Sequence, residues 1–268
     1  MTLHAHYNEI AKKYQDPSCG RGEPLLEYPL SPMDAQKPLA FFDIDGTFIR
    51  SSLLIELCRN LVRFGVFPQL AERELDATRM AWEERRASYY PYIMAVVDVY
   101  YRYLAGCDVA QVAHVGRITA HEQHNRVYVY TRELIQRLRA THTLIAISGS
   151  PEVVVQPLTH AWGFDPKLVF CSTAETTDGR YTGRRIIKMV EDGKQRFVDA
   201  CIANSSHATL TNSVGIGDTE ADIAFLERVA HPIAFNPTAE LARIAHTRGW
   251  RIVIERKDAI WVNGQLLA

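Results

Sequence analysis

The sequence of 268 residues has no long apolar run, no paired cysteines and no excess of charge of either sign. Its 30 lysines and arginines stand against 31 aspartates and glutamates, so composition gives no reason to expect nucleic acid or an anionic membrane as partner. No window approaches the roughly 20 apolar residues that a membrane helix needs, and the N-terminus lacks the apolar core of a signal peptide. We therefore expect a protein that binds no nucleic acid and spans no membrane.

The cysteines are few and scattered. There are five of them, and none forms the C-x-x-C spacing of a zinc ribbon or a redox motif: Cys19, Cys58, Cys107, Cys171 and Cys201. A disulfide framework is equally unsupported, which favours a reducing, cytoplasmic location.

The pattern along the chain predicts an α/β protein. Residues 1–37 contain four prolines and no sustained period, which indicates an irregular extension. Apolar runs such as "PLAFFDIDG", "TLIAISGS", "KLVFCS", "NSVGIGD" and "PIAFNP" read as strands, and from residue 131 they alternate with helical segments, including "TEADIAFLERVA". The fold class expected is a Rossmann-like core with a mainly parallel sheet, formed by residues 38–50 and 131–268.

Residues 51–130 show helical spacing almost throughout. This block is too long for a simple crossover between two strands, so we interpret it as an inserted all-helical cap domain. "TTDGRYTGRR", residues 176–185, has the turn chemistry of a hairpin.

Polar clusters follow three of the predicted strands. Asp43 and Asp45 end the first, Ser148 ends another, and Asp218 follows a third, with Asp222 four residues later. In open α/β sheets ligands bind beyond the carboxyl ends of the strands, so these clusters should meet at one edge. Gathered carboxylates repel one another unless a cation lies among them, and Mg²⁺ suits such an oxygen-rich site.

These residue types suit phosphoryl transfer. A carboxylate such as Asp43 can attack phosphorus, and a second acid, Asp45, can act as general acid and then base. Gly46 allows a tight turn and close approach of backbone N–H groups to a phosphate, and Gly149 offers another N–H. Lys194 supplies positive charge.

Each cluster alone has a structural alternative. D-x-D-G is common in turns, Ser148 could cap the helix that follows, and a lone lysine is usually solvated. "GDTEAD" could be a capped helix start. All four together, in this order on an alternating α/β pattern, favour the functional interpretation.

The motifs "DIDGT", "ISGS", a downstream lysine and "GDTEAD" resemble the four ordered motifs of haloacid dehalogenase-like phosphohydrolases. The helical insertion resembles the C1-type cap of the phosphoserine phosphatase-like branch. The resemblance implies a Mg²⁺-dependent phosphatase acting on a small phosphorylated metabolite. It implies that Asp43 is nucleophile and metal ligand, and that Asp45 is acid/base and binds metal through its carbonyl.

The resemblance also assigns supporting roles. Thr47 and Ser148 would contact the phosphate, Asp218 would bind the metal, and Asp222 would support Asp218. Lys194 is preferred to Lys188 as the motif lysine because it opens an amphipathic helix.

The substrate is left open, as is the oligomeric state. Ser52 occupies the position at which phosphoserine phosphatases carry a substrate-reading Glu, with Glu56 one turn later, and their cap arginine aligns near Tyr100 and Arg102. These departures disfavour phosphoserine. A phosphotransferase using the same phospho-Asp43, or a non-catalytic phosphate-binding protein, is the alternative.

Three other features have ordinary explanations beside functional ones. The spacing of His121 and His124 is conceivable for a metal, but a solvated helix face is the ordinary interpretation. Arg50 and the pair Arg85/Arg86 could attract an anionic substrate or lie exposed. The cap tyrosines could line a pocket for an apolar or cationic leaving group or simply pack between helices: Tyr89, Tyr90, Tyr92, Tyr100, Tyr101 and Tyr103.

Overall fold

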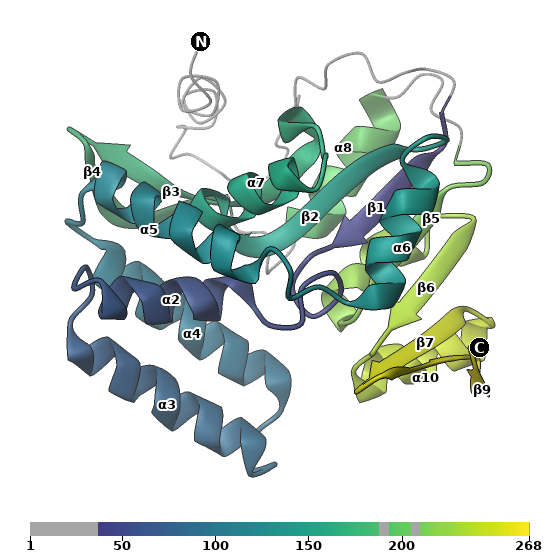
Figure 1. Cartoon of the computed structure of the whole chain (residues 1–268), viewed down its shortest axis with the longest axis horizontal. Coiled ribbons are helices and arrows are strands. Elements are labelled where there is room, and N and C mark those ends of the chain that lie inside the picture. Colours follow the sequence, from purple (N-terminus) through teal and green to yellow (C-terminus); the bar gives the residue numbers. More distant parts are fainter. Residues whose placement is uncertain (1–36, 188–192, 205–209, 268) are drawn as a thin grey trace, which may run out of the picture.

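The structure, a computed structural model, describes residues 37–187, 193–204 and 210–267 (Figure 1). Residues 1–36, most of the predicted extension, and Lys188, the alternative motif lysine, lie outside the described residues. Among the described residues, no helix is both long enough and apolar enough to cross a membrane.

One sheet organises the chain, in the order β4-β3-β2-β1-β5-β6-β7-β8-β9. The pairs from β3 through β2, β1, β5 and β6 to β7 are parallel, whereas β3/β4, β7/β8 and β8/β9 are antiparallel. The sheet is therefore mainly parallel, as predicted. Its strands are Leu39–Asp43 (β1), Thr143–Pro151 (β2), Val169–Thr177 (β3), Arg180–Ile187 (β4), Val214–Gly217 (β5), His231–Phe235 (β6), Arg251–Arg256 (β7), Ala259–Val262 (β8) and Gln265–Leu266 (β9).

Helices flank this sheet and extend beyond one of its edges (Figure 1). They are Leu53–Arg63 (α2), Gln69–Glu83 (α3), Tyr89–Leu104 (α4), Val109–Gln123 (α5), Val129–Leu138 (α6), Glu152–Ala161 (α7), Lys194–Asn204 (α8), Ile223–Leu226 (α9) and Ala239–Arg248 (α10). Short 3₁₀ turns occupy Pro166–Leu168 and Glu220–Asp222.

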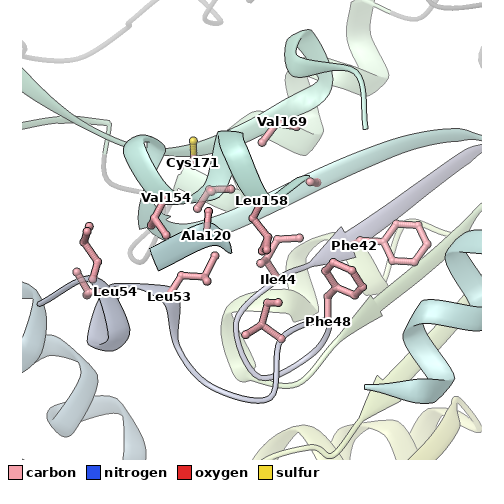
Figure 2. Close-up of a cluster of buried hydrophobic side chains, with 14 of the residues drawn as sticks. Phe42, Ile44, Phe48, Leu53, Leu54, Ala120, Val154, Leu158, Val169 and Cys171 are labelled. Atoms are coloured by element: carbon pink, nitrogen blue, oxygen red, sulfur yellow. The ribbon is translucent and has the colours of Figure 1, made fainter. Parts of the chain in front are cut away.

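Strand β1 is buried on both faces of the sheet. Ala40 and Phe42 join one apolar cluster, whereas Leu39 and Phe41 join another on the opposite face. Alternate residues of a strand point to opposite faces, so a continuous apolar run is what such a central strand requires. Figure 2 shows part of the first cluster, which also draws on residues of α2, α5 and α7.

The predicted cap shares this core. Residues of α2, α4, α5 and α7 belong to the same buried cluster as β1 and β2. Helices α5 and α7 pack so closely at Gly116 that a Cβ there would lie 2.3 Å from the carbonyl oxygen of Val153. The insertion is helical as expected. Because α2 and α5 pack against the α/β part, the predicted boundary between a core and a separate cap domain stays a prediction.

Two details differ from the sequence expectations. Periodicity predicts one helix over "TEADIAFLERVA", but the segment forms a 3₁₀ turn and the four-residue α9. The side chain of Asp222 accepts hydrogen bonds from the backbone of Asp218 and Thr219, and this local capping tightens the first turn. Helix α10 and strands β7–β9 were not predicted.

Candidate active site

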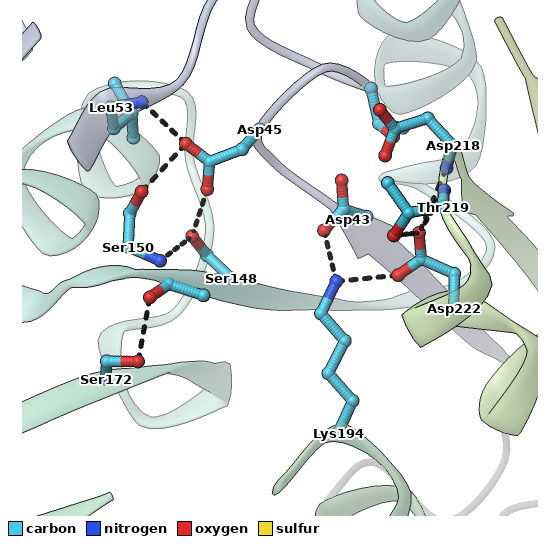
Figure 3. Close-up of polar contacts among 12 residues, drawn as sticks. Asp43, Asp45, Leu53, Ser148, Ser150, Ser172, Lys194, Asp218, Thr219 and Asp222 are labelled. Carbon is cyan, nitrogen blue, oxygen red and sulfur yellow. Dashed lines mark hydrogen bonds and ion pairs between the residues drawn. The ribbon is translucent and has the colours of Figure 1, made fainter. Parts of the chain in front are cut away.

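Strand register brings the predicted clusters together. Asp43 ends β1 opposite Ile147 of β2, so Ser148 follows directly beside it. Phe42 pairs with Ile216 of β5, which places Asp218 just beyond the neighbouring strand end. Because these strands are parallel, the predicted acids and serine meet at one edge of the sheet (Figure 3).

Lys194 lies between two buried carboxylates. Its Nζ donates to Oδ1 of Asp43 and to Oδ1 of Asp222, each at 2.6 Å. All three side chains are almost completely buried. Burial lowers the pKa of Lys194, but Asp222 and Asp43 raise it more, so the ammonium stays charged. Lys194 therefore lies beside the proposed nucleophile, and its role as the motif lysine stays a prediction.

The Asp222 carboxylate is fully occupied by donors. Oδ1 accepts from Lys194, and Oδ2 accepts from the backbone N–H of Asp218 and Thr219 at 3.0 and 2.9 Å. The Thr219 hydroxyl donates to the same Oδ2 at 3.2 Å. Asp222 thus fixes Lys194 and the backbone of Asp218.

Gly46 and Thr47 shape the approach to Asp218. Gly46 has φ of +77°, and a Cβ on it would lie 2.2 Å from Oδ2 of Asp218, so only glycine fits this turn. Thr47 is buried, and its hydroxyl donates to Oδ1 of Asp218 at 3.3 Å. The hydroxyl of Thr47 thus holds Asp218 in place, and the predicted phosphate contact of Thr47 stays a prediction.

Asp45 is held by three donors. Its Oδ2 accepts from the Ser148 hydroxyl at 2.6 Å, and its Oδ1 accepts from the Ser150 hydroxyl at 2.8 Å. The backbone N–H of Leu53, the first residue of α2, donates to Oδ1 at 2.6 Å. Asp45 thus caps the first helix after the strand and at the same time faces the site (Figure 3).

The acids suit a divalent cation. Asp43, Asp218 and Asp222 each offer a carboxylate oxygen, and these atoms lie within 4.8 Å of one another. Oδ2 of Asp43 is buried without a hydrogen-bond partner among the described residues, which an isolated carboxylate oxygen tolerates poorly. Since Asp222 is occupied by its donors, Asp43 and Asp218 are the acids that fit direct metal contact.

Without a cation these acids favour their neutral form. Burial raises the pKa of Asp43 to about 7, opposed by Lys194 and reinforced by Asp222 and Asp45. Burial and the neighbouring Asp43 also raise the pKa of Asp218 well above its usual range. A divalent ion would restore both carboxylates.

A pocket of about 360 Å³ opens over these groups, a volume suited to a small molecule. Its lining combines the acids and Lys194 with side chains from α2, α4 and the loop after β5: Asp43, Asp45, Ser52, Leu54, Tyr89, Tyr90, Ile93, Gly149, Ser150, Lys194, Asp218, Thr219, Glu220 and Ala221. Among the predicted specificity residues, Ser52 is in this lining.

The other specificity candidates lie elsewhere. Glu56 accepts from the Ser51 hydroxyl at 2.7 Å and pairs with Arg59. Tyr100 is buried against Phe67 and Tyr101, and Arg102 pairs with Glu74 with 58% of its side chain exposed. None of the three is among the residues that line this pocket in the described chain, because α4 presents its N-terminal turns there instead.

Several lining residues were missed as site residues. Ser150 was visible in "ISGSP" as a second serine two positions after Ser148, a spacing that keeps both on one side of an extended strand. Tyr89 and Tyr90 were noted only as general cap tyrosines. Ile93, Leu54, Thr219, Glu220 and Ala221 carry no signal of their own, since only the packing of the helices over the sheet edge brings them there.

Comparisons with curated proteins place the chain among phosphatases. It is 25% identical over 240 residues to phosphoserine phosphatase SerB1 of Mycobacterium tuberculosis, covering 82% of this chain and 73% of that protein. It is 24% identical over 231 residues to a histidinol-phosphatase of Neisseria meningitidis, covering 81% and 98% of the two chains.

Solved structures share the fold. A Bordetella pertussis protein described as of unknown function aligns with a TM-score of 0.65 and 23% identity, over 82% of this chain and 99% of that one. A phospho-aspartyl intermediate analogue of phosphoserine phosphatase aligns with a TM-score of 0.56 and 20% identity, over 83% and 95%. The profile of the haloacid dehalogenase-like hydrolases matches residues 40–227. The chain therefore belongs to the haloacid dehalogenase-like hydrolase family and is an enzyme of its phosphoserine phosphatase-like branch.

Proposed function

We propose that the protein hydrolyses a small phosphate monoester, with Mg²⁺ bound and with Asp43 phosphorylated in the course of the reaction. The observation that carries this proposal is the buried Oδ2 of Asp43. It lies without a hydrogen-bond partner among the described residues, while Lys194 holds the other oxygen at 2.6 Å. Asp43 lines a pocket that Asp45 and Asp218 also line.

The metal ligands proposed are the carboxylates of Asp43 and Asp218 and the backbone carbonyl of Asp45. When bound, Mg²⁺ supplies positive charge to the phosphate oxygens and to the acids. Gly46 leaves room for the Asp218 carboxylate, and Thr47 and Asp222 hold that residue in place.

The first half-reaction needs a nucleophile and an acid. A carboxylate oxygen of Asp43 forms a bond to phosphorus while the ester P–O bond breaks, and the departing oxygen takes a proton from Asp45. Lys194 favours the ionised form of Asp43, as the metal does, and adds positive charge beside the transferred group. Ser148 and Gly149 are the proposed phosphate contacts.

The second half-reaction uses the same residues in reverse. Asp45, now deprotonated, takes a proton from a water molecule, whose oxygen attacks phosphorus and releases the Asp43 carboxylate and inorganic phosphate. The hydroxyls of Ser148 and Ser150 can serve Asp45 in both states, because a hydroxyl donates to a carboxylate and accepts from a protonated acid.

Release of phosphate from p-nitrophenyl phosphate, with and without Mg²⁺, tests this proposal. The wild type should turn over only with the metal, and Asp43→Asn should lose at least about 1,000-fold in kcat, because it removes the nucleophile. Full activity of Asp43→Asn with a wild-type circular dichroism spectrum would exclude this mechanism.

The names of the relatives suggest the class of substrate. Phosphoserine phosphatase and histidinol-phosphatase are named for two small phosphomonoesters. We propose a small phosphorylated metabolite here too, and a cytoplasmic reaction, since the scattered cysteines of the sequence do not have the spacing of a disulfide framework.

A further inference from the structure

The pocket has two chemically different sides. Acids and Lys194 occupy one side, at the sheet edge, where phosphoryl transfer is proposed. Tyr89, Tyr90 and Ile93 of α4 and Leu54 of α2 form the other. Figure 1 shows α3 and α4 beyond the sheet, and the lining residues Tyr89, Tyr90 and Ile93 belong to the first turns of α4. A bound phosphate monoester would therefore direct its alcohol part toward these aromatic and aliphatic side chains.

The ring of Tyr89 is held by an aromatic cluster. It meets Trp82 edge-on at a centroid distance of 5.6 Å and Tyr92 at 6.1 Å. Trp82 and Tyr92 stack at 5.3 Å with an interplanar angle of 4°. A ring that is held by its neighbours in this way keeps its electron-rich face in a fixed position, whereas the ring of an isolated tyrosine can rotate away. Burial raises the pKa of Tyr89, and negative charge on Asp218 and Asp45 raises it further, which agrees with its position facing the acids.

The charged residues of the lining are predominantly acidic. Asp43, Asp45, Asp218 and Glu220 carry carboxylates, whereas Lys194 is the sole cation among the lining residues of the described chain. Its two hydrogen bonds at 2.6 Å go to Asp43 and Asp222. Its positive charge therefore lies where the phosphate is proposed to bind and not beside the leaving group. A bound Mg²⁺ and a phosphate dianion would offset each other's charge and leave this balance negative.

Three arginines of the insertion are paired with acids that do not line the pocket. Arg59 pairs with Glu56, Arg79 pairs with Asp76 and Glu83, and Arg86 pairs with Glu84. None of them lines the pocket in the described chain. A leaving group with a carboxylate would thus lose water on entering the pocket and be repelled by the acids there. Among the lining residues of the described chain, no cation is placed to pair with it.

We propose that the substrate is the phosphate ester of an amino alcohol without a carboxylate, and that Tyr89 and Tyr90 select it by receiving its cationic nitrogen. This inference rests on the phosphatase activity proposed above and adds the class of leaving group. Aromatic faces attract ammonium and imidazolium groups, most strongly where water is displaced. Glu220, which follows β5, also lines the pocket and adds negative charge.

Three esters of similar size test the proposal. O-phosphoethanolamine is O-phospho-L-serine without its carboxylate, and propyl phosphate replaces the ammonium by a methyl group. With the Mg²⁺-loaded full chain, kcat/KM for phosphoethanolamine should exceed that for each of the other two by about tenfold or more. Equal or higher kcat/KM for phosphoserine would overturn the proposal, and so would equal kcat/KM for propyl phosphate.

Variants of the aromatic side assign the preference to residues. Tyr89→Leu should reduce the ratio of phosphoethanolamine to propyl phosphate several-fold, whereas Tyr89→Phe, which keeps the ring, should retain most of it. Tyr90→Arg should shift the preference toward phosphoserine by supplying the missing cation. Leu70→Arg is the matched control, because Leu70 and Tyr90 are both 55% exposed on the helices of the insertion, but Leu70 does not line the pocket.

The outcomes separate the two proposals. No Mg²⁺-dependent phosphate release from p-nitrophenyl phosphate or any ester would contradict the proposed function itself. Turnover of p-nitrophenyl phosphate together with a preference for phosphoserine would leave the function intact and overturn the leaving-group assignment. If Arg85→Ala then abolished that preference, the exposed turn before α4 would be the carboxylate site.

Discussion

At the scale of single residues, Asp45 combines a structural task with a proposed catalytic one. Its carboxylate caps α2 through the N–H of Leu53 at 2.6 Å, and it is also the proposed general acid. Ser150 connects the two tasks, because its hydroxyl donates to Asp45 and accepts from the N–H of Leu54 at 2.9 Å. The acid and the first helix of the insertion therefore share one hydrogen-bond network.

Two substitutions of Asp45 should separate these tasks. Asp45→Asn and Asp45→Ala should both lose at least about 100-fold in kcat, because neither can transfer a proton. Asp45→Ala should also lower the free energy of unfolding by about 1–2 kcal/mol through loss of the cap, whereas the asparagine oxygen still accepts from Leu53. Urea unfolding of both variants measures the difference, and equal stabilities would show that Asp45 is no cap.

Gly46 gives a second residue-scale prediction. An alanine there combines a φ of +77° with a Cβ 2.2 Å from Oδ2 of Asp218, so the acid must move. Gly46→Ala should weaken Mg²⁺ binding in isothermal titration calorimetry by at least about tenfold, since Asp218 leaves its place. Gly65→Ala is the control, because Gly65 has a similar φ of +71° but no atom within 4 Å of its would-be Cβ. Unchanged Mg²⁺ affinity in Gly46→Ala would contradict the metal site.

At the scale of elements, the sequence indicated most of the sheet and of its site. Asp43, Ser148 and Asp218 could be predicted to meet because each follows an apolar run, and parallel strands end at one edge. Lys194 could be placed because it opens α8. The strands β7–β9 could not, since their burial is partial and the alternation is short: β8, for instance, has only partly buried residues.

The aromatic residues that line the pocket could not be predicted from the sequence pattern either. The six tyrosines of α4 look alike in sequence, and only the packing of its N-terminal turns beside the site decides which of them reach the pocket. Tyr89 and Tyr90 do, whereas Tyr100 lies in the core. The short α9 was missed because the Asp222 side chain competes for backbone N–H groups, an effect that helix periodicity does not register.

The crossing of α5 and α7 carries an element-scale prediction. Gly116→Val should lower the free energy of unfolding by more than about 2 kcal/mol, since its Cβ would meet the Val153 carbonyl. Arg117→Ala, at the exposed neighbouring position, should change it by less than about 0.5 kcal/mol. Equal effects in chemical denaturation would show that the two helices do not pack as described.

At the scale of the whole molecule, the buried acids couple stability to pH and to the metal. In the metal-free native protein the raised pKa of Asp43 keeps its proton bound up to a pH of about 7, whereas an unfolded chain releases that proton near pH 3.8. The native state therefore binds more protons across this window, and its stability falls as pH rises through it. Without a metal, ionisation of this buried carboxylate cluster thus lowers the free energy of unfolding.

Asp43→Asn should remove the part of this effect that comes from Asp43. In EDTA, the free energy of unfolding of the variant relative to that of wild type should increase as pH rises from about 4 to 7. Only in wild type does ionisation of Asp43 lower the stability over this range, by about 1.4 kcal/mol for each unit by which folding raises the pKa of Asp43. Thermal unfolding at several pH values gives this difference, and Mg²⁺ should stabilise wild type more than the variant at pH 8. A difference that stays constant with pH would contradict the raised pKa of Asp43.

The covalent phosphorylation of Asp43 is the central claim, and trapping it is the most direct test. Wild-type protein turning over p-nitrophenyl phosphate with Mg²⁺ is quenched in acid, and the peptide containing residues 41–50 is analysed by mass spectrometry. The account predicts one added phosphoryl group on Asp43, labile to hydroxylamine and missing in Asp43→Asn. Steady turnover with no phosphorylated peptide, or with the group on another residue, would contradict it.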